Sequence, residues 1–211
     1  TEGTTKYVMI GRDGARLATG ADNAFTRARV EDSYGHRFAI HFPNEERAAG
    51  RPARMRPAYV KQAELGAVFG LNSGWEHPLW FSGKSGTSDT NGFTRQNWWE
   101  PVGEECRMLR ENAGIIDISN FAKYICKGAG AADWRNAVFA NNMPKGVGRS
   151  CLTPLIGKRG GIAGDFTVTK LAEDEFWIIG SGMAERYHKR FFKQVPLPDG
   201  TIFESRTNDI C

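Results

Sequence analysis

The carboxylate of Asp165 has the setting in this sequence that most clearly indicates chemistry. It lies in the stretch RGGIAGDFTVTKL, residues 159–171, where glycines precede a run rich in β-branched side chains. The glycines predict a turn, because glycine adopts positive φ without steric cost. Aspartate is depleted from strands, and a charge that enters a core needs a partner or a role. Either Asp165 caps backbone N–H groups of the turn, or it lies beside a ligand and holds or moves a proton on an amine.

Other residue types that could carry chemistry are weaker candidates. The segments GWEHPLWF (74–81) and NWWEP (97–101) hold four of the six tryptophans. They are interpreted as core or interface packing, with a stacking wall for a flat heterocycle as the alternative. The isolated His77 and His188 are interpreted as structural rather than as catalytic bases. Cys151 has no histidine close to it in the sequence, so a thiol nucleophile is not expected.

Several cofactor and metal sites are not expected from the motifs. No GxGxxG follows a predicted strand, and GKSG at 83–86 lacks the upstream glycine of a phosphate-binding loop. The chain is therefore not expected to bind a dinucleotide by these means. The four cysteines form no CxxC pair and have no histidine at metal-ligand spacing, so no metal site is predicted. Scattered cysteines of this kind predict free thiols in a cytoplasmic protein.

Composition and charge narrow the class of protein further. The 211 residues are 40% hydrophobic and 25% charged, which is typical of a globular protein. No apolar run approaches the roughly 20 residues that cross a bilayer, so no membrane partner is expected. The net charge of +4 is concentrated in RPARMRP (51–57) and KRFFK (189–193). Neither is a basic block with the interleaved aromatics that bind nucleic acid, so none is expected as a partner, whereas a small anionic ligand fits the charge.

The first part of the chain, to about residue 74, is expected to be rich in loops. A helix is predicted over 23–35, a strand over 36–42 that Pro43 ends, and a second short helix over 57–66. The small polar residues SGKSGTSDTN at 82–91 predict a linker.

After this linker the pattern predicts helices that alternate with strands. Helices are expected over 100–114, 130–143 and 183–195, and strands over 115–119, 122–128, 148–156, 165–171, 175–180 and 201–206. The predicted apolar faces of the three helices are Val102, Cys106, Leu109 and Ala113; Trp134, Val138 and Phe139; and Met183, Tyr187 and Phe191. This alternation indicates the α+β class, with antiparallel sheets and packed helices.

Three long motifs resemble a known family in the same order along the chain. RQNWWEPVGEECRMLRENAGIIDISNFAKY (95–124), GRSCLTPLIGKRGGIAGDFTVTKL (148–171) and FWIIGSGMAERYH (176–188) resemble the folate-binding aminomethyltransferase domain of the glycine-cleavage T-protein. Upstream, residues 34–59 and 66–81 resemble the central domain of the FAD-dependent dimethylglycine and sarcosine dehydrogenases, in which such a folate domain follows a flavin domain. The resemblance implies a central-domain segment at 1–81, a linker at 82–92 and the N-terminal part of a folate domain at 93–211. Because the chain ends directly after a predicted strand, this folate domain is expected to be truncated.

The resemblance also implies a function and a set of site residues. Enzymes of this family oxidise an N-methyl amine at FAD and pass the one-carbon unit to tetrahydrofolate, giving 5,10-methylenetetrahydrofolate. It implies that Asp165 is catalytic and that Thr153, Gly161, Thr169 and Gly180 bind the folate. The family often has tyrosine and asparagine where this chain has Thr169 and Gly180, so those two contacts differ here.

The partners implied are an N-methyl amine, folate and a flavin domain or subunit. The FAD-binding part is absent from this sequence, so the isolated chain is not expected to oxidise amines. The alternative is a non-catalytic subunit or fragment that docks on a separate flavoprotein.

Overall fold

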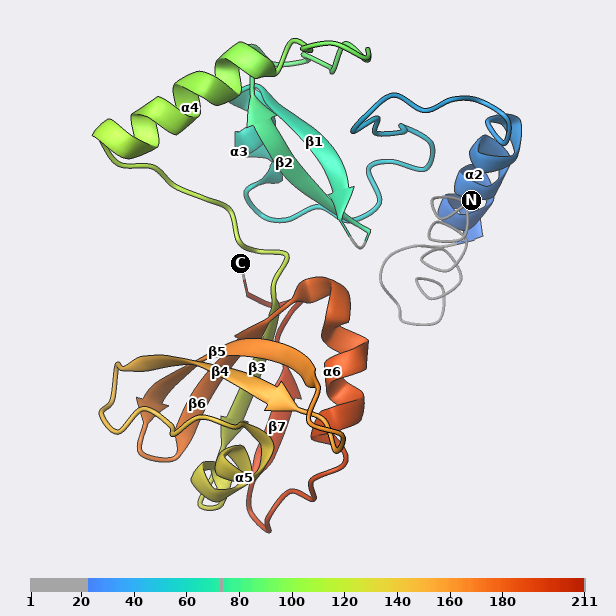
Figure 1. Ribbon diagram of the computed structural model, residues 1–211. Coiled ribbons are helices and arrows are strands. Elements are labelled where there is room, and N and C mark those ends of the chain that lie inside the picture. Colours follow the sequence, from blue (N-terminus) through green and yellow to red (C-terminus); the bar gives the residue numbers. More distant parts are fainter. Residues whose placement is uncertain (1–22, 73, 211) are drawn as a thin grey trace. The chain divides into compact units, whose positions relative to one another are not determined.

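A computed structural model describes residues 23–72 and 74–210, and the chain divides into two compact units, Thr1–Asp117 and Ile118–Cys211. The first unit contains α2 (Asn23–Gly35), α3 (Tyr59–Glu64), β1 (Ala67–Asn72), β2 (Trp75–Phe81) and α4 (Trp99–Glu111). The second contains β3 (Ala122–Lys127), α5 (Ala131–Val138), β4 (Ser150–Ile156), β5 (Ile162–Ala172), β6 (Glu175–Gly180), η1 (Gly182–Ala184), α6 (Glu185–Phe192) and β7 (Ile202–Ser205) (Figure 1). The predicted α+β class, with antiparallel sheets and packed helices, is confirmed. The predicted domain limits at 81 and 93 stay a prediction.

The first unit is built on an antiparallel hairpin that the sequence patterns did not predict. Strands β1 and β2 pair from Ala67 opposite Phe81 to Asn72 opposite Trp75, and Gly74 adopts a φ of 85° at the turn. The Trp75 ring contacts two cations, because the guanidinium carbons of Arg54 and Arg56 lie 3.6 and 3.9 Å from its centre. This tryptophan therefore stacks on arginine side chains of its own chain, as cation–π geometry favours.

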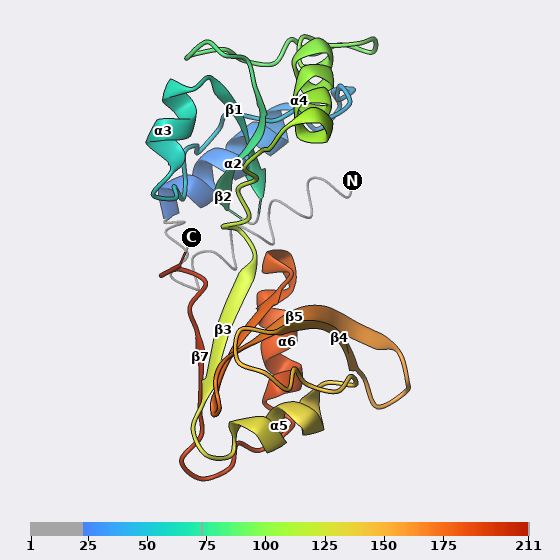
Figure 2. The same ribbon diagram turned by 90° about the vertical axis from the view of Figure 1, so that its left-hand side faces the viewer.

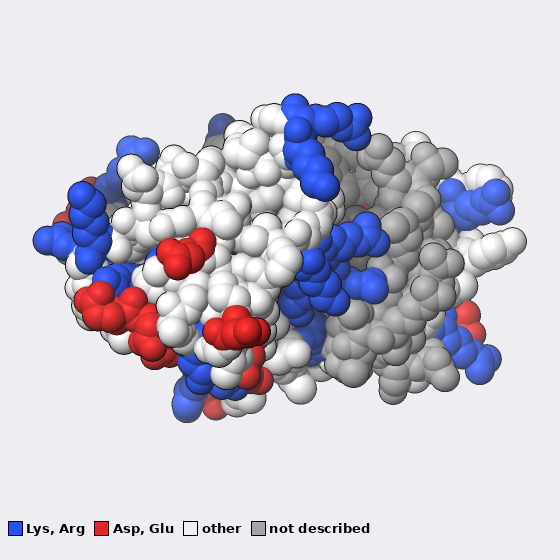
Figure 3. Space-filling model, turned by 90° about the horizontal axis from the view of Figure 1, so that it is seen from below, with Lys and Arg blue, Asp and Glu red and all other residues white. Residues whose placement is uncertain are grey.

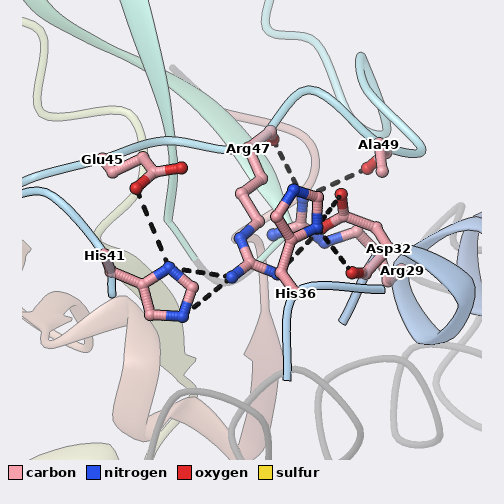
Figure 4. Close-up of polar contacts among 7 residues, drawn as sticks. All are labelled: Arg29, Asp32, His36, His41, Glu45, Arg47 and Ala49. Atoms are coloured by element: carbon pink, nitrogen blue, oxygen red, sulfur yellow. Dashed lines mark hydrogen bonds and ion pairs between the residues drawn. The ribbon is translucent and has the colours of Figure 1, made fainter. Parts of the chain in front are cut away.

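Helix α2 anchors the segment that follows it through a polar cluster (Figure 4). The buried Arg29 donates hydrogen bonds from Nη1 to the carbonyl oxygens of Arg47 and Ala49, at 2.9 and 3.1 Å. Arg47 in turn donates to Oδ2 of Asp32 at 3.1 Å, and its Nη2 lies 2.8 Å from Nε2 of His41. These contacts tie the loop to the helix, so this part of the chain is held by side-chain bonds rather than by a sheet.

Two of the predicted strands are wrong. Residues 36–42 form a turn followed by irregular chain, and the side chains of Phe38 and Ile40 are 93% and 84% exposed. Residues 115–119 also lie outside any strand, with Ile115 and Ile116 exposed. An alternation of apolar residues can give a strand one apolar face, but a strand also needs a second strand to pair with. These two segments pair with no strand in the described part of the chain.

The second unit is a single antiparallel sheet with the order β4-β5-β6-β3-β7. Helices α5 and α6 cover one face of it, as the two perpendicular views show (Figure 1, Figure 2). Trp134 of α5 and Phe192 of α6 pack into one buried cluster with Tyr124, Phe166 and Ile178 of the strands. All the strands predicted after residue 121 are confirmed. The core of this unit therefore lies between the sheet and the two helices.

The apolar faces predicted for the helices have mixed outcomes. In α5, Trp134 and Val138 are buried as expected. In the last helix the prediction is wrong for Met183 and Tyr187, which are exposed, whereas Phe191 is partly buried against the core. The side chains that α6 buries fully are His188 and Phe192. The prediction assumed one continuous helix from Met183. Met183 lies instead in the short η1 turn, and α6 begins only at Glu185, so different residues face the core.

Helix α4 buries none of its side chains within the described structure, although its apolar stripe was predicted to face inward. Met108 and Leu109 are 54% and 47% exposed. An amphipathic helix with this much apolar surface in water is typical of an association site.

Three cysteines, Cys106, Cys126 and Cys151, are free thiols, which confirms the prediction, and Cys211 lies outside the described residues. Cys126 is buried, and this burial raises the pKa of its thiol to about 11. No helix among the described residues has the length and apolar character needed to cross a membrane. The same residues contain no group of three or more His, Cys, Asp and Glu side chains arranged to hold a metal ion.

Arg135 of α5 is a cation inside the core of the second unit. Arg135 is only 2% exposed. Its Nε and Nη1 atoms are buried and have no hydrogen-bond partner in the described structure. The guanidinium carbon lies 3.1 Å from the centre of the Phe176 ring. Burial lowers the pKa of Arg135 to about 10. The ring contact offsets only part of the cost of removing this charge from water.

Replacing Arg135 by Met is expected to stabilise the protein. Met keeps an unbranched apolar stem of similar length and removes an unpaired charge, so the free energy of unfolding should rise by about 1–3 kcal/mol. Urea unfolding followed by tryptophan fluorescence measures this change. Arg190→Met, at an exposed position of the neighbouring helix, is the matched control and should stay within about 0.5 kcal/mol of the parent. A clear loss of stability in the Arg135 variant would show that the guanidinium is a favourable part of the core.

Candidate functional site

The turn predicted before Asp165 is present between β4 and β5. Gly160 adopts a φ of 81°, its N–H donates to the carbonyl of Gly157 at 2.8 Å, and the Gly157 N–H donates to the carbonyl of Gly161 at 2.8 Å. Strand β5 begins directly after this turn, and Asp165 is its fourth residue, opposite Pro154 of β4. The glycines therefore close a hairpin whose outgoing strand carries the carboxylate.

The Asp165 side chain is exposed rather than buried. Within the described structure it makes no hydrogen bond and no ion pair, so it does not cap the turn. Its neighbours Gly164 and Phe166 face the helices, and since successive side chains of a strand point to opposite faces, Asp165 faces away from them. The expectation that this charge enters the core is corrected: it lies on the face that α5 and α6 leave uncovered.

The side chains that share this face form a mixed apolar and polar surface. By strand register, Thr167 lies between Leu152 of β4 and Ile179 of β6, and Thr169 lies between Ser150 and Trp177. We name this surface the Asp165 face; its members are Ser150, Leu152, Asp165, Thr167, Thr169, Trp177 and Ile179. Leu152 is 71% exposed, whereas the indole N–H of Trp177 is buried and has no partner among the described residues. The sequence interpretation missed Trp177, although the alternation in EFWIIG separates it from the buried Phe176 and Ile178.

The four predicted folate-binding positions are not all on this face. Thr169 shares it with Asp165, and its hydroxyl lies 2.7 Å from the Ser150 hydroxyl. Gly161 lies in the turn, where a Cβ would meet no atom within 4 Å. Thr153 is buried on the covered face, and its Oγ1 accepts a hydrogen bond from the Asn141 N–H at 3.1 Å.

Gly180 also lies on the covered face, opposite Phe166. A Cβ at this position would come within 2.6 Å of two atoms of the Phe166 ring. The structure thus gives Thr153 and Gly180 packing roles, and the part of all four positions in ligand binding stays a prediction.

One buried titratable residue lies on the other side of β5 from Asp165. His188 of α6 packs its ring against Phe166, with centroids 4.6 Å apart and planes at 62°. Burial lowers the pKa of His188, while the negative charges of Asp165 and Glu185 raise it in part. The imidazole is therefore neutral at neutral pH. The sequence analysis interpreted this residue as structural and did not connect it with Asp165.

Comparison with known proteins places the chain in a family. Residues 58–211 match the GCVT N-terminal domain, and residues 2–55 match the FAD dependent oxidoreductase central domain. The chain is 31% identical over 200 residues to mitochondrial dimethylglycine dehydrogenase of Mus musculus, covering 94% of this chain and 23% of that protein. It is 30% identical over 173 residues to the formaldehyde-forming 4-methylaminobutanoate oxidase of Paenarthrobacter nicotinovorans, covering 81% and 21%. The sarcosine dehydrogenase of Homo sapiens is 28% identical over 174 residues, covering 69% and 19%.

A solved structure supports the fold. The glycine cleavage system aminomethyltransferase T from Bartonella henselae matches with a TM-score of 0.58 at 21% identity, covering 72% of this chain and 38% of that one. The chain spans 23% of the length of the dimethylglycine dehydrogenase that it matches, so only part of such a protein is represented here.

Replacing Gly180 by Ala is expected to destabilise the protein, because the new methyl group would collide with the buried Phe166 ring. Overpacking of this kind typically costs about 1–3 kcal/mol of unfolding free energy. Gly161→Ala is the matched control and should change stability by less than about 0.5 kcal/mol, since its Cβ enters open space. Thermal and urea unfolding measure both variants. Equal stabilities would mean that Phe166 has room to move and that the glycine is not required for packing.

Proposed function

We propose a role in folate-dependent one-carbon transfer for this chain, which belongs to the GCVT N-terminal domain family. In this proposal the carbon released when an N-methyl amine is oxidised at FAD passes to tetrahydrofolate. The names of the relatives support the substrate class, since dimethylglycine, sarcosine and 4-methylaminobutanoate are all N-methyl amines. The match of residues 2–55 to the central domain of an FAD dependent oxidoreductase supports a flavin domain or subunit as partner.

The observation that carries the proposal is the position of Asp165, an exposed carboxylate held on a strand, on the face of the sheet that the helices leave uncovered. Folded proteins pair or hydrogen-bond the acids that they bury, and an exposed acid on a rigid strand is free to accept hydrogen bonds from a ligand. Asp165 is held on β5 directly after a closed turn and has no partner in the described structure. A carboxylate in this state accepts a hydrogen bond from the N–H groups of a reduced pterin and accepts a proton from an amine nitrogen.

The Asp165 face has groups of the chemistry that a folate needs. A reduced folate joins a flat polar heterocycle to an aromatic ring and a glutamate. The exposed Leu152 and the neighbouring Ile179 offer apolar contact, and the hydroxyls of Ser150 and Thr169 offer polar contact. Asp165 offers the acceptor at one end of the same face. The residues present therefore fit the cofactor, whereas FAD has no glycine-rich site in this sequence and is assigned to the partner.

When tetrahydrofolate is bound, two of its nitrogens take up the carbon. In the overall reaction, formaldehyde and tetrahydrofolate give 5,10-methylenetetrahydrofolate and water. The proposed role of Asp165 is to orient a folate nitrogen by accepting its hydrogen bond at the carboxylate, and to hold the proton that this nitrogen loses. Phe166, the next residue of the strand, is buried on the covered face and packs the strand that carries Asp165 against the helices.

A second function is favoured by helix α4. Its apolar side chains are exposed, which supports docking on another protein, and a flavoprotein is the partner that the family suggests. In that case the chain would be a non-catalytic subunit whose folate face is not used. We further propose a cytoplasmic location, in keeping with the free thiols.

Asp165→Asn separates these functions. Asn keeps the size of the side chain and one acceptor oxygen but cannot take a proton, so the rate of 5,10-methylenetetrahydrofolate formation from formaldehyde and tetrahydrofolate should fall about 10²–10⁴-fold. Asp174→Asn, an exposed turn residue at the other end of β5, is the matched control and should leave the rate unchanged. The parent chain should also bind tetrahydrofolate in a calorimetric titration.

Two outcomes contradict the proposal at different levels. If the parent chain neither binds tetrahydrofolate nor accelerates the condensation, the folate function itself is wrong and the docking function remains. If the parent is active and the Asn variant is equally active, the folate function holds but Asp165 is not its proton acceptor.

A further inference from the structure

His188 is a buried titratable side chain that the proposed chemistry does not use. The residue is 2% exposed, and its Nδ1 is inaccessible and has no hydrogen-bond partner in the described part of the chain. A phenylalanine or leucine would fill the same apolar site without leaving a polar atom unsatisfied. Buried polar groups without partners are uncommon in folded proteins and require a specific explanation.

The imidazole packs against the residues on both sides of Asp165. Its Nε2 lies 2.6 Å from the point that a Cβ of Gly164 would occupy, so the ring takes the space of a side chain at that position. On the other side it packs against Phe166, with ring centroids 4.6 Å apart. Strand alternation places both contacts on the covered face of β5 and the Asp165 carboxylate on the opposite face. The imidazole therefore supports the strand directly beneath Asp165.

The sheet itself constrains this residue weakly. Strand β6 ends at Gly180, which pairs with Phe166, so no residue of β6 pairs with Asp165. On the other side its partner is Pro154, which has no backbone N–H to donate and whose carbonyl accepts a hydrogen bond from the Ala140 N–H at 3.0 Å. With few ladder bonds at this point, packing from beneath has a large share in setting where the Asp165 backbone lies.

The two residues are also coupled through their charges. The negative charge of Asp165 raises the pKa of His188, against the larger lowering effect of burial. Glu185, one turn earlier on α6, acts in the same direction as Asp165. Removal of the Asp165 charge should therefore make the imidazole lose its proton at a lower pH.

We propose that His188 is a positioning residue for Asp165, whose imidazole, wedged between Gly164 and Phe166, fixes the strand that presents the carboxylate to the folate. The inference rests on the proposed function, because it assigns His188 a role only through Asp165. It adds a residue from α6, on the far side of the sheet, to a site that otherwise consists of strand residues.

A double-mutant cycle between His188 and Asp165 tests this role. His188→Ala in the parent chain should lower the rate of folate capture at saturating tetrahydrofolate by about 10²-fold, because small displacements of a reacting group have effects of this size. In the Asp165→Asn background the same substitution should change the rate less than twofold, since the group that it positions is already gone. The loss of thermal stability should be the same in both backgrounds. Equal fractional losses of rate in both backgrounds would overturn the proposal and leave His188 a packing residue.

A second test does not depend on activity. An NMR titration of the histidine ring protons, with His188→Gln to identify the signal, should show that the pKa of His188 is lower in Asp165→Asn than in the parent. An unchanged pKa would contradict the electrostatic coupling. If His188→Ala does not fold, His188→Gln serves in the cycle, because Gln keeps a polar side chain of similar length.

A third test measures hydrogen exchange after a methyl group is added at Gly164, next to the His188 ring. Gly164→Ala should speed hydrogen exchange at the Asp165 and Phe166 amides, since its methyl group collides with Nε2, and His188→Ala should relieve this effect in the double variant. Gly161→Ala, whose methyl group meets no atom within 4 Å, is the matched control. Independent effects of the Gly164 and His188 substitutions would contradict the wedge. A parent chain that fails to bind tetrahydrofolate contradicts the folate function instead, so the two failures are distinguishable.

Discussion

The packing of Phe166 is the interaction on which the arrangement of the second unit depends. Its ring is 1% exposed and meets Phe139, His188 and Phe192 with centroids 5.2, 4.6 and 5.6 Å away. Aromatic pairs at these distances add specific geometry to the burial of apolar area. Because a strand has a period of two residues, burying Phe166 against the helices fixes Asp165 on the opposite face. The glycines at 164 and 180 belong to the same constraint, since a Cβ at Gly180 would strike the Phe166 ring and one at Gly164 would strike His188 and come within 3.0 Å of Phe166. The orientation of the carboxylate is therefore a consequence of hydrophobic packing on the other side of the sheet.

Two acidic side chains of the described residues have opposite physical environments. Glu76 is 4% exposed, and Arg51 donates to both of its carboxylate oxygens at 3.1 and 2.6 Å. This is the geometry in which a buried carboxylate offsets the cost of leaving water. Asp165 is the opposite case, because it is exposed and has no partner in the described structure. In the view of Figure 3, acidic and basic side chains are interspersed at one end of the molecule. The candidate site is distinguished by the fixed place of Asp165 on the uncovered face of the sheet, rather than by a surface of one sign.

The sequence predicted the strands of the second unit better than the faces of its helices. Strands β4, β5 and β6 were predicted because β-branched and aromatic residues alternate between clear turn signals, and the glycine turn before Asp165 follows from the same rules. The inward face of α6 was wrong because periodicity gives the spacing of apolar residues but not the residue at which a helix begins, and Met183 lies in η1. The hairpin of β1 and β2 was missed because prolines and glycines around it resemble a loop. His188 could not be connected with Asp165, since the contact joins a helix to a strand 23 residues earlier and depends on tertiary packing.

The two candidate functions use different parts of the chain and do not exclude one another. Docking through helix α4 would involve the first unit, whereas the Asp165 face belongs to the second, and no residue is common to both. Burying the exposed Met108 and Leu109 against a partner would remove apolar surface from water and favour association. This association would not require Asp165, because the position of Asp165 is set by Phe166 and His188 within its own unit. A flavoprotein that releases a one-carbon unit could thus be held through one surface while the other receives the product. Docking alone would leave one feature without a use, the buried His188 whose Nδ1 has no partner in the described structure beneath the strand that carries Asp165.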